Sequence, residues 1–170
     1  VFGGVHNEEI QFNEKTLWSG PANTIGAASG SRTFMNFGSL IISNLDKAIW
    51  DGVTDYVRYL DIEEGVAGVE FKNANGVKQI RKFFSSAPDQ VIAGNYTVEG
   101  NGKVDLLFKL EPGTGIGAGN VTYENGTASF TGAMTSVNYA ARLHVVADKG
   151  AKITASARGI TVNNATEDTL

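Results

Sequence analysis

The chain has 170 residues and a mass of 18.0 kDa, which is the size of one ordinary domain. Hydrophobic residues make up 42% of it, charged residues make up 19%, and the net charge is -4. This balance supports a packed core and excludes both a disordered acidic tail and the basic surface of a nucleic-acid-binding domain. No stretch approaches the roughly 18 to 20 consecutive apolar residues of a membrane helix. We therefore expect a soluble domain whose partners include neither nucleic acid nor a membrane.

Cysteine is absent, which excludes disulfide bonds, a thiolate nucleophile and a cysteine-based zinc site. The cytoplasm, the periplasm and the bacterial exterior all remain open, and a secreted, cell-surface or periplasmic location is slightly favoured. The sequence starts at Val1 without an initiator methionine, and both ends fall inside strand-like patterns. We therefore expect residues 1–170 to be one domain cut from a longer chain.

The elements expected along the chain are short strands, because 21 glycines separate short runs of alternating apolar and polar residues. In chain order, a short strand is expected at Ile10 and Phe12. At most one short helix follows, over 45–51, and then a strand over 56–62. This pattern predicts an all-β fold.

Three Asn-Gly dipeptides each lie between two β-prone runs, and this dipeptide favours tight turns whose two central residues have positive φ. Each therefore predicts a hairpin, and Asp148-Lys149-Gly150 predicts a fourth. The paired runs are 66–71 with 77–85, 91–98 with 104–110, 121–123 with 127–131, and 138–147 with 151–157.

The alternation of side chains indicates how the strands pack. In 104–110 the residues Val104, Leu106 and Phe108 point to one face, while Leu107 is apolar on the other face, as Val57 is in its own strand. Apolar residues on both faces predict a sheet that is covered on both sides, by a second sheet and by another domain or loop. Ten to thirteen short strands therefore predict an antiparallel β-sandwich of two packed sheets.

Two motifs suggest a ligand site but lack the context that such a site needs. The run Gly113 to Ala118 matches a nucleotide-binding fingerprint, yet no helix follows to receive a pyrophosphate, so a flexible loop is favoured. The two histidines, His6 and His144, cannot form a metal triad by themselves. We interpret them as a turn residue and a sheet-face residue.

The acidic group Asp61, Glu63 and Glu64 suggests calcium or a pair of glycosidase carboxylates. It lacks the spacing of a calcium loop, and alternating strand directions would separate the carboxylates. A solvated strand end is favoured. The sequence therefore offers no catalytic residue, no cofactor-binding residue and no metal ligand.

The segment with the most candidate functional residues is 8–21, where a polar loop follows the strand at Ile10 and Phe12. Asn13, Glu14 and Trp18 have the composition of a sugar-contacting surface, because a ring stacks on pyranose C–H groups while amides and carboxylates bind hydroxyls. The alternative is that Trp18 anchors the loop on the core. Composition favours the anchor, since tryptophan is usually largely buried.

The same segment carries a family resemblance. It resembles the N-terminal domain of glycoside hydrolase family ninety-five, the α-L-fucosidase family, and further stretches agree with that family in order. The matching stretches are GGVHNEEIQFNEKTLWSGP at 3–21, FMNFGSLIIS at 34–43, VTDYVRYLDIEEGVAGVEF at 53–71, IRKFFSSAPDQVIA at 80–93 and AARLHVVADKGAKITA at 140–155. The chain departs from the family between Gly20 and Phe34, where the family has a longer helical excursion, and at Ser39, where the family has Asp.

The resemblance implies a bacterial glycosidase in which an N-terminal super-sandwich of β-strands precedes a helical catalytic barrel. The barrel supplies the general acid and the base-activated water of an inverting hydrolysis. No catalytic residue is transferred to these 170 residues, and we expect them to be inactive alone. The implied partners are the barrel of the same chain and an oligosaccharide that carries terminal L-fucose or L-galactose, with no cofactor.

A second hypothesis comes from a different class of protein. The richness in Asn, Thr and Gly, together with Trp18, is also typical of a self-standing carbohydrate-binding or surface-adhesion sandwich. Such a module would bind glycans without any barrel.

Overall fold

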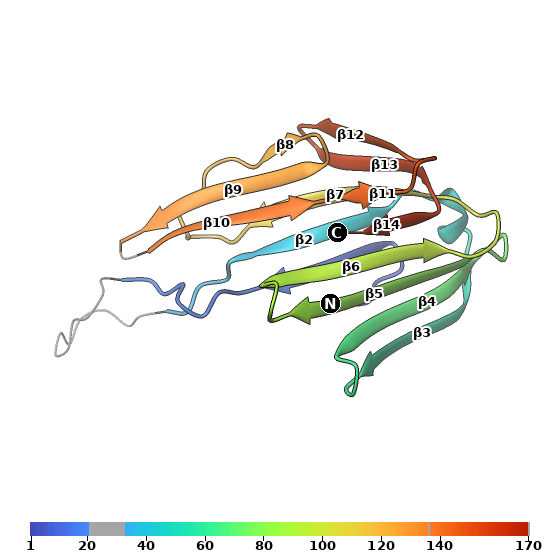
Figure 1. The fold of residues 1–170 in the computed structure, drawn as a ribbon, viewed down its shortest axis with the longest axis horizontal. Coiled ribbons are helices and arrows are strands. Elements are labelled where there is room, and N and C mark those ends of the chain that lie inside the picture. Colours follow the sequence, from blue (N-terminus) through green and yellow to red (C-terminus); the bar gives the residue numbers. More distant parts are fainter. Residues whose placement is uncertain (21–32, 136, 170) are drawn as a thin grey trace.

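The chain folds into antiparallel β-strands in a computed structural model that describes residues 1–20, 33–135 and 137–169 (Figure 1). Fourteen strands and one three-residue 3₁₀ helix occur in these residues, which confirms the predicted all-β sandwich. The elements are β1 (Asn7–Phe12), β2 (Gly38–Asn44), η1 (Lys47–Ile49), β3 (Val53–Asp61), β4 (Val66–Asn73), β5 (Lys78–Ser86), β6 (Val91–Val98), β7 (Val104–Pro112), β8 (Thr122–Glu124), β9 (Thr127–Met134), β10 (Val137–His144), β11 (Val146–Ala147), β12 (Lys152–Ser156), β13 (Gly159–Ala165) and β14 (Glu167–Thr169).

One layer of the sandwich is a five-stranded sheet with the order β1-β2-β7-β13-β12. Its middle strand, β7, carries Leu106 and Phe108, which are completely buried, and β13 places Ile160 and Val162 beside them. The alternating apolar and polar residues predicted over 104–110 therefore belong to a central strand of the sheet. This face supplies much of the main hydrophobic core.

The opposite layer consists of two sheets, one of six strands, β11-β14-β6-β5-β4-β3, and one of three strands, β10-β9-β8. Both pack on the five-stranded sheet: the ring of Tyr96 on β6 meets that of Phe108 on β7 at 6.4 Å, and Phe130 on β9 meets Phe37, the residue before β2, at 5.9 Å. The prediction of two sheets is therefore wrong for this layer. It is divided because β10 ends at His144, and the next strand, β11, pairs with β14 instead.

Two of the four predicted hairpins are confirmed, β4 with β5 and β8 with β9. The other two are wrong, because β6 and β7 lie in different sheets and so do β11 and β12. Asn101-Gly102 and Asp148-Lys149-Gly150 therefore join the two layers of the sandwich. Turn residues indicate that the chain reverses direction, but they do not indicate which strand the next strand pairs with.

Asn125-Gly126 has the turn geometry that its sequence predicts, with φ of 45° and 74° at the two central residues. At the first hairpin, by contrast, only Gly76 of the dipeptide has positive φ, at 77°. There the Oδ1 atom of Asn73 accepts hydrogen bonds from the backbone N–H groups of Asn75 and Val77. The Asn73 side chain therefore stabilises a turn that differs from the type expected for an Asn-Gly pair.

The predicted helix over 45–51 is reduced to the single turn η1. Asp46 caps this turn, because its Oδ1 accepts a hydrogen bond from the backbone N–H of Ala48 at 2.9 Å. The same carboxylate accepts from the amides of Asn73 and Gln79 through Oδ2. Gln79 in turn accepts from the Asn44 amide at 2.7 Å, so a buried polar network links β2 of one layer to β4 and β5 of the other.

Strand β3 is an edge strand, and in the described residues it has exposed apolar side chains on both faces. Leu60 is 69% exposed, and Val57 on the opposite face is 53% exposed. A bulge between Thr54 and Val57 shifts its register against β4. Among the described residues, the cover predicted for both faces of this strand is therefore absent at Val57 and Leu60.

Two glycines lie beneath tyrosine rings of the neighbouring strand. Gly68 is directly opposite Tyr59, and Gly132 is directly opposite Tyr139. A Cβ atom on either glycine would come within 2.1 Å or less of the facing tyrosine. The missing side chains let the rings lie flat across the strands, which is a recognised way of shielding a glycine in a sheet.

Candidate functional site

The loop that follows β1 contains the three residues predicted to contact sugar. Leu17, and not Trp18, anchors this loop: Leu17 is 1% exposed and belongs to the main core, whereas Trp18 is 44% exposed. The interpretation of Trp18 as the buried anchor is therefore wrong. The apolar neighbour fills that role, and the indole remains at the surface.

Trp18 packs against Phe34, whose ring meets it edge-on at a centroid distance of 5.2 Å. The indole N–H donates to the carbonyl oxygen of Lys15 at 2.8 Å, which fixes the ring against its own loop. A backbone hydrogen bond from the N–H of Met35 to the carbonyl oxygen of Leu17, at 3.0 Å, holds the two segments together. The result is a pair of half-exposed aromatic side chains of the kind that can stack on a sugar.

Asn13 and Glu14 both make hydrogen bonds within the protein, Asn13 to the segment before β2 and Glu14 inside the loop. Asn13 Oδ1 accepts a hydrogen bond from the backbone N–H of Phe37 at 3.3 Å. Glu14 Oε2 accepts from the backbone N–H of Thr16 at 2.8 Å and from the Thr16 hydroxyl. The hydroxyl contact, the largest cause, lowers the pKa of Glu14 below its ordinary value. Both side chains therefore shape the loop that presents the aromatic pair.

The segment in which the chain departs from the resembled family, between Gly20 and Phe34, falls mostly outside the described residues, which resume at Thr33. Its two ends are close together, because the backbone N–H of Ser19 donates to the carbonyl oxygen of Thr33 at 2.9 Å. The aromatic pair of Trp18 and Phe34 therefore lies at the base of this segment.

The other candidate motifs have structural roles. The run Gly113 to Ala118 leads to β8 and not to a helix, and Ile116 within it is buried, so it is a loop packed on the core. His144 lies exposed on β10, as predicted, and its Nδ1 faces the hydroxyl of Thr127 at 3.2 Å. His6 lies in the bend before β1, where its ring meets that of Trp50 edge-on at 4.0 Å.

The acidic group forms the turn between β3 and β4, where Asp61 Oδ1 accepts hydrogen bonds from the backbone N–H groups of Glu63 and Glu64. All three residues are exposed. In the parts of the chain that the structure describes, no three His, Asp or Glu side chains come together in a way that could hold a metal ion. The same residues contain no helix long and apolar enough to cross a membrane.

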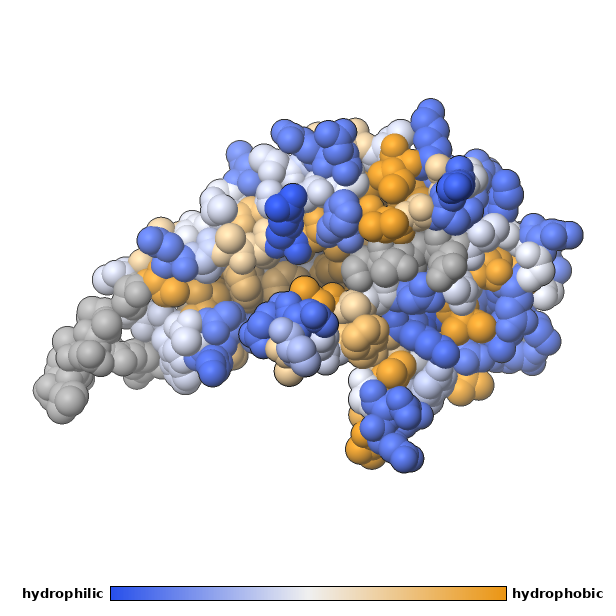
Figure 2. Space-filling view, viewed as in Figure 1, coloured by the Kyte–Doolittle hydropathy of each residue, from blue (hydrophilic) through white to orange (hydrophobic). Residues whose placement is uncertain are grey.

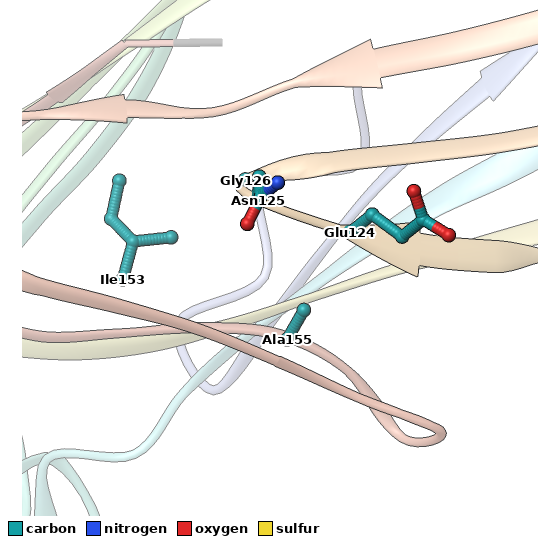
Figure 3. A pocket seen from close by; sticks show the side chains of 5 residues that line it. All are labelled: Glu124, Asn125, Gly126, Ile153 and Ala155. Atoms are coloured by element: carbon teal, nitrogen blue, oxygen red, sulfur yellow. The ribbon is translucent and has the colours of Figure 1, made fainter.

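Open hollows occur beside the β8–β9 turn. One of about 420 Å³ lies between that turn and β12, and is lined by Glu124, Asn125, Gly126, Ile153 and Ala155 (Figure 3). A second, of about 350 Å³, lies on the outer face of the three-stranded sheet, where Thr122, Ser129 and Arg142 form one row across the strands. Their polar linings are open to solvent and bring no metal-binding cluster together.

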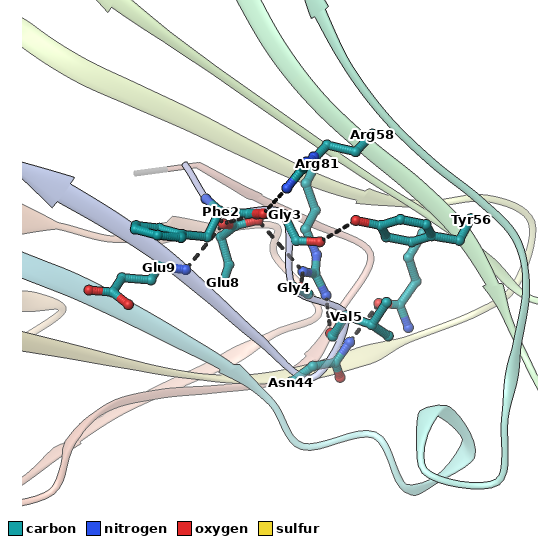
Figure 4. A network of polar contacts seen from close by, with 11 residues as sticks. Phe2, Gly3, Gly4, Val5, Glu8, Glu9, Asn44, Tyr56, Arg58 and Arg81 are labelled. Atoms are coloured by element: carbon teal, nitrogen blue, oxygen red, sulfur yellow. Dashed lines mark hydrogen bonds and ion pairs between the residues drawn. The ribbon is translucent and has the colours of Figure 1, made fainter.

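A buried ion pair that the sequence reasoning missed lies between the layers (Figure 4). Glu8 on β1 is completely buried, and its Oε1 accepts hydrogen bonds from the backbone N–H groups of Phe2, Gly3 and Glu9 at 2.8 to 3.1 Å. One carboxylate therefore holds the N-terminal segment in place.

Arg81 on β5 completes this network. It is 1% exposed, it donates hydrogen bonds to the carbonyl oxygens of Gly4 and Val5, and its Nη1 lies 4.0 Å from Oε2 of Glu8. The guanidinium also lies over two rings, those of Phe71 and Tyr96. A usable sequence signal existed, since Glu8 shares the alternation of Ile10, and Arg81 that of Phe83.

These features describe a β-sandwich whose N-terminal segment is held by buried polar contacts and whose loop after β1 presents the ring of Trp18 beside Phe34. A family model described as "Glycosyl hydrolase family 65, N-terminal domain" matches residues 22–170. The chain belongs to this family. No curated protein matches it at a significant level. The family membership identifies a non-catalytic N-terminal β-domain of a glycoside hydrolase. It does not extend to glycoside hydrolase family ninety-five or to a fucosidase specifically. The loop at 13–18 precedes the matched range.

Proposed function

We propose that the chain is the N-terminal domain of a bacterial α-L-fucosidase-like glycoside hydrolase, which packs on a helical catalytic barrel of the same protein. The observation that carries the proposal is the glycoside hydrolase family match over residues 22–170, on an all-β fold. The fucosidase level is supported by the ordered segments from 3–21 to 140–155. Hydrolysis itself belongs to the barrel, and the domain contributes packing and part of the rim of the active site.

Exposed apolar side chains support the packing role. On the six-stranded sheet, large apolar residues stand out at the β3–β4 hairpin and at the ends of β5 and β6, where a monomeric domain would usually be polar. They are Tyr56, Val57, Leu60, Ile62, Phe84 and Val91. A catalytic domain that covers them would remove this surface from water, which is favourable by roughly 25 cal/mol per Å² of apolar area.

The loop of Asn13, Glu14 and Trp18 supports the rim role. It presents the ring of Trp18, which packs against Phe34, on a backbone held by Leu17 and by the Glu14–Thr16 contacts. A rigid ring at the edge of a cleft binds the remote sugars of an oligosaccharide and makes no contact with the reacting bond. Its loss should therefore weaken the binding of long substrates more than it affects the chemistry.

The test uses the full-length protein with an aryl α-L-fucoside and a fucosylated oligosaccharide. Trp18→Ala should raise KM for the oligosaccharide about tenfold, the equivalent of one 1.4 kcal/mol contact, and leave kcat for the aryl substrate unchanged. Trp50→Ala is the matched control, because Trp50 is 66% exposed and follows η1, at the other end of the molecule in Figure 1. Absence of activity on every α-L-fucosyl and α-L-galactosyl substrate would overturn the proposal.

The self-standing binding module remains the second candidate, and the exposed pair of Trp18 and Phe34 is the observation that favours it. It predicts that the isolated 170-residue chain binds glycans on an array or by calorimetry, and that Trp18→Ala abolishes this binding. Equal binding by the variant and by the parent chain would reject it.

A further inference from the structure

We propose that a groove between β6 and β10 is the seat of one more strand, supplied by the polypeptide that follows residue 170 and continues β14. This rests on the proposed function, in which the chain is one domain of a longer protein. The strand would join the six-stranded and three-stranded sheets into one continuous sheet.

The groove lies where the divided layer of the sandwich opens. β10 and β6 run beside each other without pairing, and β2 of the other layer is seen between them (Figure 1). Figure 2 shows the molecule hollowed at this place, with apolar residues at the bottom of the hollow. At one end the hollow is already filled, because β14 pairs with β6 on one side and with β11 on the other.

The edge of β6 can pair with a strand longer than β14. The backbone N–H of Val98 donates to the carbonyl oxygen of Thr166, at the β14 side. Since strand residues alternate between their two neighbours, the backbone groups of Gly94 and Ile92 face the same side as those of Val98. Among the described residues, β14 pairs with β6 from Thr97 to Asn95, and no strand pairs with Ile92 on this side.

The edge of β10 has a matching alternation. The backbone N–H of Val145 donates to the carbonyl oxygen of Gly126, toward β9. The backbone groups of His144 and Arg142 therefore face away from β9 and toward the groove. β11 continues this alternation, since Val146 pairs with Thr169.

One strand satisfies both edges. In β14 the even-numbered residues bond to β6 and the odd-numbered residues to β11, as the pairs Tyr96 with Asp168 and Val146 with Thr169 require. In the same register, position 172 comes opposite Ile92, and positions 171 and 173 come opposite His144 and Arg142. No bulge or shift is needed to occupy both sides of the groove.

The side chains facing the groove favour an apolar filling. Position 172 would share the inner face with Ile92 and Leu143, because directly opposite residues point the same way. The inner face of β10 is incompletely covered, since Val137, Tyr139 and Ala141 pack on the main core yet remain only half-buried. Position 172 should therefore be apolar, and position 173, which shares the outer face with Arg142, should be polar.

The continuation of β14 fits the groove better than a separate chain does. It is already in register at one end, so each added residue gains hydrogen bonds on both sides without the entropy of bringing two molecules together. A second copy would have to insert a free strand beside the existing end of β14.

The experiment places cysteine pairs in the full-length protein, which is convenient because residues 1–170 contain no cysteine. One variant combines Ile92→Cys with cysteine at position 172, and its matched control combines Ala93→Cys with the same cysteine. Paired residues on adjacent strands are about 5.5 Å apart at Cα, within the range of a disulfide, whereas a one-residue shift puts the side chains on opposite faces. Mass spectrometry after mild oxidation reads the cross-link.

We expect an intramolecular cross-link for the 92–172 pair and none for the 93–172 pair. Hydrogen exchange on the unaltered proteins gives a second reading, in which the Ile92 amide should exchange at least about tenfold more slowly in the full-length protein than in residues 1–170. A 93–172 cross-link, a cross-link between two molecules, or equal exchange at Ile92 would overturn the inference. Fucosidase activity without the 92–172 cross-link would reject the strand alone, and the cross-link without that activity would reject the proposed function alone.

Discussion

Strands β7 and β3 have similar patterns of apolar and polar residues but opposite environments. Both alternate, and both carry apolar residues on each face, yet Phe108 on β7 is completely buried while Leu60 on β3 is 69% exposed. β7 has partners on both sides and a second layer over its inner face, whereas β3, in the residues that the structure describes, pairs with β4 alone and forms the edge of its sheet. The difference shows that an alternating pattern identifies a strand but not its place in the sheet.

Truncating the buried member of this pair should have the largest effect. Phe108→Ala should destabilise the chain by about 4 kcal/mol, because a large cavity remains among residues that cannot collapse into it. Leu60→Ala should change the free energy of unfolding by less than about 0.5 kcal/mol. Urea unfolding of the two variants measures both values. Similar losses of unfolding free energy would show that Leu60 is buried and not exposed.

The buried and exposed ion pairs should differ in the same way. Arg81→Met should cost about 3 kcal/mol, because it leaves Glu8 buried with its charge unpaired. Lys72→Ala removes the surface ion pair between Lys72 and Asp55, in which the lysine is 43% and the aspartate 63% exposed. This change should lower the free energy of unfolding by between about 0 and 1 kcal/mol. Chemical unfolding at pH 7 compares them, and a variant at position 81 as stable as the parent would contradict the role given to this network.

The two glycines beneath tyrosines should separate into a costly and a cheaper position. Gly132→Ala must displace Tyr139, whose hydroxyl donates a hydrogen bond to the carbonyl oxygen of Ile116, and should cost about 2 kcal/mol. Gly68→Ala displaces Tyr59 beside the exposed edge, where the ring has room to move, and should cost about 1 kcal/mol. Thermal unfolding ranks the two variants, and the reverse order would show that β3 is held more firmly than its exposure indicates.

The smallest effect is expected at the loop that follows β1. Thr16→Ala removes the hydroxyl that lowers the pKa of Glu14, so this pKa should rise toward its ordinary value. Because the folded pKa is lowered, the contribution of this contact to stability is present above the ordinary pKa and is lost as the pH falls through the lowered one. NMR titration of the Glu14 carboxyl in the parent and in the variant reads the shift; identical titration curves would argue against the contact.

The sequence was sufficient for the fold class and for strands that begin and end at turn residues. It could not supply the sheet partners of β6 and β11, because the turns at Asn101-Gly102 and Asp148-Lys149-Gly150 look the same whether they join strands of one sheet or of two. The helix over 45–51 was overestimated because the Asp46 cap is also bonded to the buried amides of Asn73 and Gln79. That contact is long-range and invisible in a local pattern.

The candidate loop was found from its composition, but the roles within it were not. Trp18 and Leu17 are adjacent, and the choice of anchor depends on which one faces the core formed by residues far away in the sequence. The burial of Glu8 and Arg81 depends equally on the layers meeting around them. Local propensity was adequate where neighbours in the chain decide the structure, and it failed where distant strands decide it.

The measurement that tests the central claim most directly is an assay of L-fucose and L-galactose release by the full-length protein beside residues 1–170. We predict release by the full-length protein and none by residues 1–170, since hydrolysis is assigned to the barrel. Release by residues 1–170 would contradict the non-catalytic role, and a full-length protein inactive on all α-L-fucosyl and α-L-galactosyl substrates would contradict the assignment to a fucosidase-like enzyme.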